Sequence, residues 1–248
     1  MRLGVNVPNF GPGTNPDVLR RWALTVEGLG FDLLMVSDHI AVTPDVAEQY
    51  PAPFYEPFTT LSWLAGLTRG IRFGALGVPF RDRGRLTDEH LLAIRAAWQD
   101  DTDYRSGHIP LWIGGNSDAA LRRAVRLGDA WHPLRFTPGW MAEAAGRLTA
   151  CAADQGRPAP ALMPRIALRL TDAPVTASIS GGDRLAGHGT IDQIMADLGQ
   201  LRALGADTVV LDPFNGDPRE TARPETAWRT LATVAERTRS HDIDTERS

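Results

Sequence analysis

The chain has 248 residues, of which 43% are hydrophobic and 23% are charged, and its formal net charge is −4. This composition is typical of a globular domain, and the charge excludes a sequence-wide attraction to nucleic acid or to anionic membranes. No apolar run approaches the roughly 18 residues of a membrane-spanning helix, so we expect no membrane partner.

Cysteine, lysine and histidine usage narrows the chemistry further. Cys151 is the only cysteine, which excludes an intrachain disulfide and an all-cysteine metal site. All 26 lysine-plus-arginine residues are arginine, so Schiff-base and P-loop lysines are excluded. The histidines lack the spacing of a metal site, and we expect no metal. The N-terminus lacks the plan of a signal peptide, which favours a cytoplasmic protein.

Apolar runs alternate with helical patterns from the start of the chain. The run LGVNVP precedes a helix for which Asn15 is the expected N-cap and Pro16 the first residue, and Gly30 ends it. The continuous apolar run FDLLMVSDH is typical of a strand buried on both faces. A proline-rich loop over residues 43–57, a helix near residues 58–68 and the run GIRFGALGVPF come next.

The alternation continues through the second half. RLTDEHLLAIRAAW predicts a helix capped by Thr87, and PLWIGGNSDAALRR passes from a strand through two glycines into another helix. GDAW is a short strand, residues 138–155 predict a helix that contains Cys151, and MPRIALRLTDA is a further strand. Residues 174–188 form a loop with two adjacent glycines.

The last quarter predicts two helices and one strand. GTIDQIMADLGQLRALG opens with a capping box of Thr190 and Gln193 and closes on Gly205. DTVVLDPF is a buried strand, residues 224–238 form the closing helix, and residues 239–248 are a polar tail that frays.

Repeated strand–helix units predict an α/β fold with a parallel sheet, either doubly wound or closed as a (β/α) TIM-type barrel. The length and the absence of a G-x-G-x-x-G turn after the first strand favour the barrel, as one domain over residues 1–248. In a barrel, the active site lies at the carboxyl ends of the strands. The candidates at these ends are Asn6, Pro8, Asn9, Ser37, Asp38, His39, Gly114, Gly115, Asn116, Ser117, His132, Gly189, Thr190 and Asp212.

Two of these stretches carry the strongest functional signal. Histidine titrates near neutral pH, so His39 beside Asp38 could exchange a proton with a substrate; alternatively, loop backbone satisfies His39 and Asp38 is a local cap. Gly114 and Gly115 lie between a strand and a helix, where they form either a tight turn or a cradle of backbone N–H groups for an anion.

Structural interpretations are favoured for the other candidates. We expect His132 to serve packing, and Asp212 to be a turn residue rather than a functional one. The cluster Arg81, Arg83 and Arg85 is interpreted as a solvated face, with an anion contact as the alternative.

Five stretches, in this order, resemble the luciferase-like monooxygenase superfamily, and more closely its coenzyme F-420-dependent oxidoreductase branch. They are GLGFDLLMVSDHI, LTRGIRFG, LGVPFRDRGRLTDE, PLWIGGNSDAALRRAVRLGDAWHP and GTIDQIMADLGQLRALGADTVVL. The likeness extends from residue 1 to about residue 237, and the fourth stretch is its most specific part. The resemblance implies a (β/α) barrel that transfers a hydride between a deazaflavin or flavin and a small organic substrate.

The resemblance also implies roles for particular residues. The phosphate of the cofactor would bind at Gly114, Gly115, Asn116 and Ser117. Asp38 and His39 would border the reactive edge of the ring, with His39 as a proton relay, and Gly74 would contact the cofactor. Coenzyme F-420 is the expected cofactor, and FMN is the alternative.

The sequence departs from the family pattern after its third strand. IRFGA joins LGVPF directly, so one helix–strand unit is missing, and we expect a barrel shortened to seven core strands. The strands beside the gap would either pair or leave an edge that residues 75–80 partly cover. An exposed edge favours a homodimer. Three hypotheses stand beside the oxidoreductase. The protein could bind the cofactor without catalysis, it could be a remnant barrel that binds little, or it could be an unrelated barrel that binds a phosphate ligand.

Overall fold

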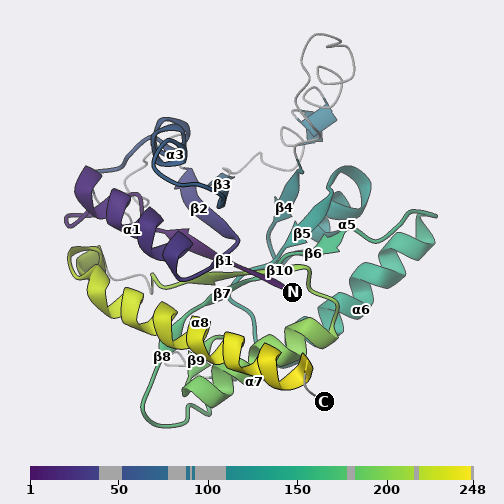
Figure 1. Cartoon of the computed structure of the whole chain (residues 1–248). Helices are drawn as coiled ribbons and strands as arrows, with labels where there is room; N and C mark the ends of the chain where they lie inside the picture. Colours follow the sequence, from purple (N-terminus) through teal and green to yellow (C-terminus); the bar gives the residue numbers. More distant parts are fainter. Residues whose placement is uncertain are drawn as a thin grey trace.

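The computed structural model describes residues 1–38, 52–77, 88–89, 91–92, 110–177, 182–214 and 218–246. Parallel strands form its centre, and helices surround them (Figure 1). No helix in this part of the chain combines the length and the apolar character needed to cross a membrane. His39, the arginine cluster of residues 81–85 and the expected cap Thr87 lie outside the described residues.

The largest sheet has five parallel strands in the order β3-β2-β1-β10-β7. These strands are β1 (Arg2–Val7), β2 (Leu33–Asp38), β3 (Arg72–Gly77), β7 (Arg165–Ala167) and β10 (Thr208–Asp212). Gly4 on β1 lies level with Leu33 on β2 and with Val210 on β10. The first strand of the chain therefore pairs with the last one, as it does in a barrel.

A second parallel sheet has the order β4-β5-β6, formed by β4 (Trp112–Gly114), β5 (Ala130–His132) and β6 (Ala161–Leu162). Only residues 163–164 separate β6 from β7, and a parallel bridge joins Leu134 to Arg165. Residues 161–167 thus border both sheets. With β6 and β7 taken as one segment, these two sheets contain seven parallel segments, which confirms the predicted α/β class. The predicted number of seven core strands for the whole chain stays a prediction, because residues 78–87 and 93–109 lie outside the described part.

Strands β3 and β4 lie at the two ends of this arrangement, and the described residues show no pairing between them. Ala75 and Gly77 pair with Val36 and Asp38, so this part of the run continues β3. The expectation that residues 75–80 cover the gap is therefore wrong for 75–77, because their backbone groups serve the β2–β3 ladder. Residues 78–80 lie outside the described part.

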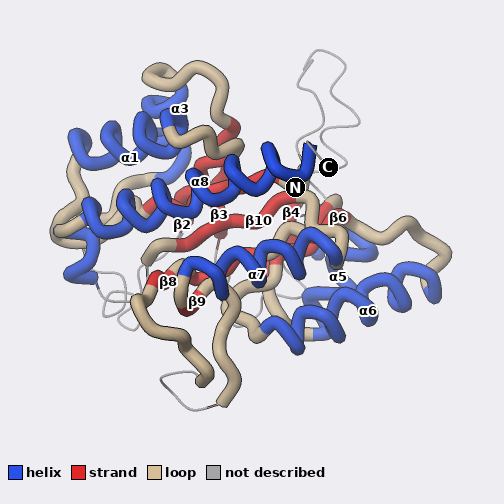
Figure 2. The backbone as a smooth tube through the Cα atoms, turned by 60° about the horizontal axis from the view of Figure 1, so that its bottom comes forward, coloured by secondary structure: helices blue, strands red, loops and turns tan. Residues whose placement is uncertain are grey.

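The described residues also contain six α-helices, one 3-10 helix and two short strands. They are α1 (Pro16–Gly28), α3 (Pro57–Ala65), α5 (Asp118–Leu127), α6 (Pro138–Asp154), α7 (Ile191–Ala203), α8 (Pro224–Glu246), η1 (Pro218–Ala222), β8 (Arg169–Leu170) and β9 (His188–Gly189). The Asn15 cap and the capping box of Thr190 and Gln193 are confirmed. Figure 2 shows α7 and α8 side by side over the sheet.

The C-terminal end of the chain differs from the prediction. Helix α8 continues to Glu246, whereas residues 239–248 were expected to fray. The sequence has no glycine or proline between Pro224 and Glu246 that would end the helix. Arg239 Nη1 also donates a hydrogen bond of 3.0 Å to the carbonyl oxygen of Leu29, which ties this part of α8 to the end of α1.

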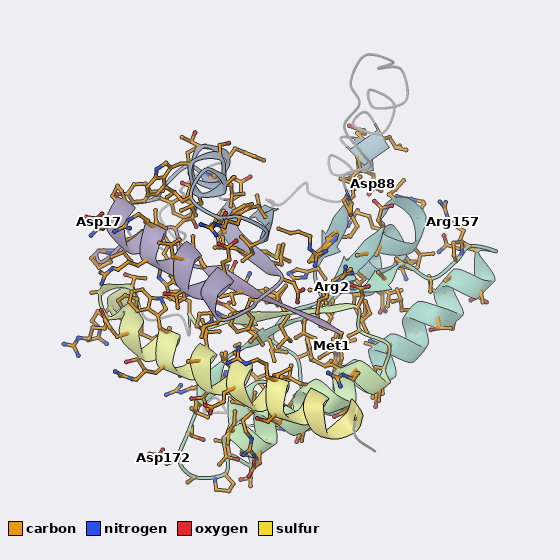
Figure 3. The ribbon with its side chains drawn as sticks, viewed as in Figure 1. Met1, Arg2, Asp17, Asp88, Arg157 and Asp172 are labelled. Atoms are coloured by element: carbon orange, nitrogen blue, oxygen red, sulfur yellow. The ribbon has the colours of Figure 1, made fainter. Side chains whose placement is uncertain are left out.

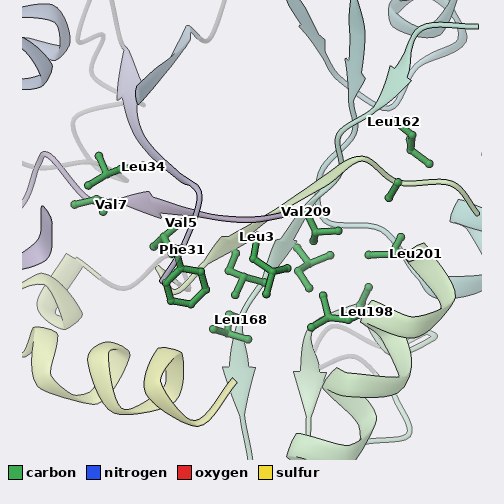
Figure 4. Close-up of a cluster of buried hydrophobic side chains, with 14 of the residues drawn as sticks. Leu3, Val5, Val7, Phe31, Leu34, Leu162, Leu168, Leu198, Leu201 and Val209 are labelled. Carbon is green, nitrogen blue, oxygen red and sulfur yellow. The ribbon is translucent and has the colours of Figure 1, made fainter. Parts of the chain in front are cut away.

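Successive side chains along each strand point to opposite faces of the sheet, and the two faces have different surroundings. Leu3, Val5 and Val209 belong to the main hydrophobic core, where they pack with residues of α7 such as Leu198 and Leu201 (Figure 4). The opposite face carries a small cluster of Leu33, Met35 and Val210 with Trp112, which lines the interior between the strands. Because side chains alternate along a strand, this interior face also receives Asn6, Gly74, Gly114, His132, Arg165 and Asp212.

Candidate functional site

The turn after β4 requires a glycine at residue 115. Gly115 has a φ of 114°, in the left-handed region that side chains rarely adopt. A Cβ at this position would also approach the Cβ of Ala120 at 3.2 Å. The N–H of Gly115 donates to the carbonyl oxygen of His132 over 3.3 Å. This N–H, which the sequence analysis assigned to an anion, is thus already engaged by a long hydrogen bond.

Gly114 has no comparable structural requirement. Its φ lies outside the left-handed region, and among the described residues a Cβ there would meet only the carbonyl oxygen of His132, at 3.9 Å. Gly114 shares its face of the sheet with Trp112, which packs against the apolar side chains of Leu33, Met35 and Val210. The space beside Gly114 is therefore open on the interior side.

The beginning of α5 presents unsatisfied N–H groups. Ser117 is the N-cap, and its hydroxyl accepts a hydrogen bond of 3.2 Å from the N–H of Ala120. Within the described part of the chain, the N–H groups of residues 116–119 have no protein acceptor. The carboxylate of Asp118 lies 3.8 Å from Arg147 and is largely exposed. A helix start with free N–H groups favours an anion, as does the helix dipole.

The side chain of Asn116 fixes the neighbouring loop. Its Nδ2 donates to the carbonyl oxygen of Leu134 over 2.7 Å, and its Oδ1 accepts from the N–H of Leu134 over 2.9 Å. The turn after β4 and the loop after β5 are therefore joined as one unit. Asn116 can serve an anion only through its backbone, as the sequence analysis expected.

A buried ion pair lies on the interior face. Arg165 Nε donates to Asp212 Oδ2 over 2.9 Å, and Arg165 Nη2 contacts the same oxygen. The side chain of Arg165 is 13% exposed and that of Asp212 is 3% exposed. Asp212 is a turn residue as expected, because its Oδ1 accepts a hydrogen bond of 3.1 Å from the N–H of Phe214. Its pairing with Arg165 was not predicted, and Arg165 was missed. Alternation within MPRIALRL and TVVLD places both on one face, which is the signal that identifies them.

His132 lies fully buried on the same face. Its Nδ1 is hydrogen-bonded to the carbonyl oxygen of Met163, which can only accept, so Nδ1 carries the proton. Burial, followed by the charge of Arg165, lowers the pKa of His132 to about 4. The ring is therefore neutral at pH 7, and its Nε2 is an acceptor. The expected packing role fits this burial and the neighbouring Trp112 ring, at 5.6 Å between centroids.

Two buried acceptors in this region have no partner among the described residues. They are His132 Nε2 and Asn6 Oδ1. Val5 pairs with Leu211, so the next residue, Asn6, lies at the level of Asp212. We call Asn6, His132, Arg165 and Asp212 the interior cluster. Buried acceptors without donors are costly, and a ligand or water that supplies N–H or O–H groups removes that cost.

The remaining expected site residues have separate positions. Asp38 ends β2 opposite Gly77 and is half-buried, while His39 lies outside the described residues. A Cβ at Gly74 would meet Met35 Cγ at 3.3 Å, so packing against Met35 accounts for this glycine. Among the residues that the structure describes, no cluster of histidine, cysteine, aspartate or glutamate side chains is arranged to hold a metal ion.

Asn9 connects the ends of the first two strands. Its Nδ2 donates to the carbonyl oxygens of Ser37, over 2.9 Å, and Tyr55, over 2.8 Å, and its Oδ1 accepts from the N–H of Ser37 over 3.1 Å. Asn9 is fully buried. This residue therefore holds the rim of the barrel rather than facing a ligand.

Residues 73–178 match the model of the luciferase-like monooxygenase family. This segment, which is less than half of the chain, is thus similar to the luciferase-like monooxygenases. It contains β4, the turn of residues 114–117, α5, β5 and the Arg165 strand. No curated protein matches the sequence.

Several solved structures are similar to the chain along most of its length. An EDTA monooxygenase from Chelativorans sp. BNC1 superposes with a TM-score of 0.68 at 12% identity, covering 98% of this chain and 94% of that chain. A coenzyme F-420-dependent secondary alcohol dehydrogenase has a TM-score of 0.63 at 12% identity, covering 89% and 96%. The oxygenating constituent of the Pseudomonas putida 3,6-diketocamphane monooxygenase, in complex with FMN, has 0.63 at 11%, covering 95% and 96%. These similarities establish the fold.

Proposed function

We propose that the protein is a cytoplasmic oxidoreductase that transfers a hydride between a deazaflavin or flavin cofactor and a small organic substrate. One observation carries this proposal: the turn of residues 114–117 combines open space beside Gly114 with unsatisfied N–H groups at the start of α5. A phosphate fits such a site, because the N–H groups and the helix dipole both favour an anion. The turn lies inside the segment that matches the family.

The interior cluster suits the ring of such a cofactor. His132 Nε2 and Asn6 Oδ1 are buried acceptors that a ring N–H or O–H would satisfy. The Trp112 side chain contributes apolar surface on the same face. When bound, the deazaflavin or flavin supplies the hydride chemistry itself, and the protein positions and polarises it.

The chain's own residues have distinct proposed roles. Asn116 holds the phosphate turn against the loop after β5, and the Arg165–Asp212 pair holds the interior face in register. Asp38 and His39 are proposed to border the reactive edge of the ring, with His39 holding or passing a proton. The position of Asp38 at the carboxyl end of β2 supports this assignment.

Coenzyme F-420 is the proposed cofactor and FMN is the alternative. The residues SDH, which begin in the last two positions of β2, support the first choice, and one protein of similar fold was solved with an F-420 adduct. Another was solved with FMN. Equilibrium titration with both cofactors at one salt concentration tests the choice. We expect coenzyme F-420 to bind more tightly; a preference for FMN would reverse the choice, and binding of neither would overturn the function.

A matched pair of glycine variants tests the site itself. Gly114→Val would fill the open space beside the turn, so we expect cofactor affinity to fall at least about tenfold without a large loss of stability. Gly70→Val is the control, because Gly70 is exposed, lies outside the turn of residues 114–117, and a Cβ there would meet no heavy atom of the described residues within 4 Å. Equal cofactor affinity for Gly114→Val and the parent would show that the phosphate does not bind at this turn.

Cofactor binding without turnover is the second candidate function. It is favoured by the positions of β3 and β4, which are not paired with each other in the described residues. The test adds alcohols, aldehydes or oxygen to the cofactor complex and follows the absorbance of the bound ring. A change in redox state with any substrate supports the oxidoreductase, whereas tight binding with no such change supports the carrier.

We also propose that the protein is a homodimer. Helix α3 exposes Phe58 and Trp63, whose exposed fractions are 64% and 40%, and Leu67 follows it. Large apolar side chains exposed on one helix favour association. Light scattering coupled to size-exclusion chromatography should give twice the monomer mass for the parent chain and the monomer mass for Phe58→Arg/Trp63→Arg. A monomeric parent would contradict the proposal.

A further inference from the structure

A cavity of about 660 Å³ lies beside the carboxyl ends of β1, β7 and β10. Its walls come from residues 168–170 after β7, residues 213–214 after β10, helix η1 and the first turns of α8. Neither the turn of residues 114–117 nor the interior cluster contributes to its lining. The cavity is therefore separate from the proposed cofactor site.

The deep part of the cavity is apolar and rigid. Trp22, Leu168 and Phe214 line it, and each of them is nearly or completely buried. The ring of Trp22 packs edge-on against Trp228, with 5.6 Å between centroids, and that of Phe214 packs edge-on against Phe10, at 4.9 Å. These contacts fix the shape of the apolar surface before any ligand arrives.

The rim of the cavity is cationic. Among the described residues that line it, three are arginines, Arg169, Arg219 and Arg223, and one is acidic, Glu220. Within the described part of the chain, Arg169 and Arg223 form no ion pair. Two guanidinium groups beside an apolar surface provide bidentate donors for a carboxylate.

Close backbone packing holds the wall formed by η1. A Cβ at Gly13 would lie 2.1 Å from the Cα of Ala222, so only glycine permits this approach. The N–H of Gly13 also donates to Thr221 Oγ1 over 3.4 Å. The loop after β1 thus fixes η1, and with it the neighbouring Arg219 and Arg223.

We propose that this cavity is a second ligand site, which binds an amphiphilic organic carboxylate. The apolar part of this ligand would lie against Trp22, Leu168 and Phe214. The carboxylate of the ligand would bind to Arg169 and Arg223. The volume falls within the range of about 300–1,000 Å³ that is usual for small-molecule sites. In TIM-type barrels, the loops after the last two strands commonly bind anions, which is where this cavity lies.

Calorimetric titration of the full chain tests the site with decanoate, below its micelle concentration, and with 1-decanol as the uncharged match. We expect decanoate to bind at least about tenfold more tightly than decanol. Arg169→Gln/Arg223→Gln should remove that preference while decanol still binds. Arg157→Gln is the control and should bind as the parent does. Arg157 is an exposed arginine after α6 that does not line the cavity, and it lies on the opposite side of the molecule from Asp17 at the start of α1 (Figure 3).

Two further variants make the result specific. Ala227→Trp fills the cavity from α8 and should abolish binding of both probes. Gly114→Val should leave decanoate binding unchanged, so failure of the cofactor proposal and failure of this one are distinguishable. Absence of decanoate binding by the parent, or equal decanoate affinity in the double arginine variant and the parent, would overturn the proposal.

Discussion

Arg165 and Asp212 form an ion pair between neighbouring parallel strands, with 2.9 Å between Arg165 Nε and Asp212 Oδ2. The second carboxylate oxygen accepts a hydrogen bond of 3.1 Å from the N–H of Phe214. Both oxygens of a nearly buried carboxylate are thus engaged. Because that N–H belongs to the loop after β10, the pair also positions the residues that lead to the second cavity.

Removing one member of this pair should destabilise the fold strongly. Asp212→Leu leaves the charge of Arg165 buried without a partner, which costs about 3–5 kcal/mol of the free energy of unfolding. Arg165→Met/Asp212→Leu removes both charges and should recover most of this loss. Denaturation in guanidinium, followed by far-UV circular dichroism, measures both values. A single variant within about 1 kcal/mol of the parent would contradict the prediction.

The stability of the protein should fall between pH 6.5 and pH 4. Burial and the charge of Arg165 lower the pKa of His132 from 6.5 to about 4, so over this range the unfolded chain binds a proton that the folded chain does not. The contribution of His132 is fully present above pH 6.5 and is lost as the pH falls, by roughly 3 kcal/mol in total.

His132→Gln should flatten this pH dependence, measured as the free energy of unfolding at pH 7, 6 and 5. Burial, followed by the charges of Arg169, Arg135 and Arg184, lowers the pKa of His188 as well, so the comparison is made in a His188→Gln background. An unchanged slope in the double variant would show that neither imidazole is responsible.

Substitutions at Ser117 should separate stability from anion binding. Ser117→Ala removes the cap of α5 and should cost about 1 kcal/mol. Ser117→Asp keeps a capping oxygen and should leave the stability near that of the parent, but it places a negative charge at the turn. Inorganic phosphate and the cofactor should therefore bind Ser117→Asp more weakly than Ser117→Asn. Equal affinities of these two variants would argue against an anion at this helix.

Two glycine-to-alanine substitutions should have opposite signs. Gly13→Ala places a methyl group against the backbone of Ala222 and should cost about 1–3 kcal/mol, because neither segment can shift freely. Gly146→Ala lies in α6, where a Cβ would meet nothing within 4 Å, and should stabilise by about 0.5–1 kcal/mol. Thermal unfolding of the two variants gives the comparison. A stabilising effect of Gly13→Ala would show that η1 is not held as described.

The helix starts were predictable from the sequence because their determinants are local. The Asn15 cap and the Thr190–Gln193 box each depend on residues within three positions of one another. The parallel fold was predictable for a similar reason, since each strand–helix unit repeats the same pattern. The glycine pair 114–115 was recognisable as a turn because it lies between a strand and a helix, and the structure places the left-handed conformation at Gly115.

The features that escaped prediction depend on contacts between distant segments. Arg165 and Asp212 are 47 positions apart, and only the order β10–β7 makes them neighbours. The extension of α8 involves a contact between Arg239 and Leu29 across 210 positions. The open space beside Gly114 also depends on tertiary structure. The sequence alone does not distinguish Gly114 from Gly115, and only their backbone conformations and neighbours do.

The three hydrogen bonds of Asn9 have a consequence for amide hydrogen exchange. The N–H of Ser37 is held by the side chain of a fully buried residue in the loop after β1, so it can open only when β2 and this loop separate. Its protection factor therefore reports the integrity of this rim rather than the local fraying of β2. Ser37 is thus a single-residue probe of whether a ligand tightens the rim next to Asp38.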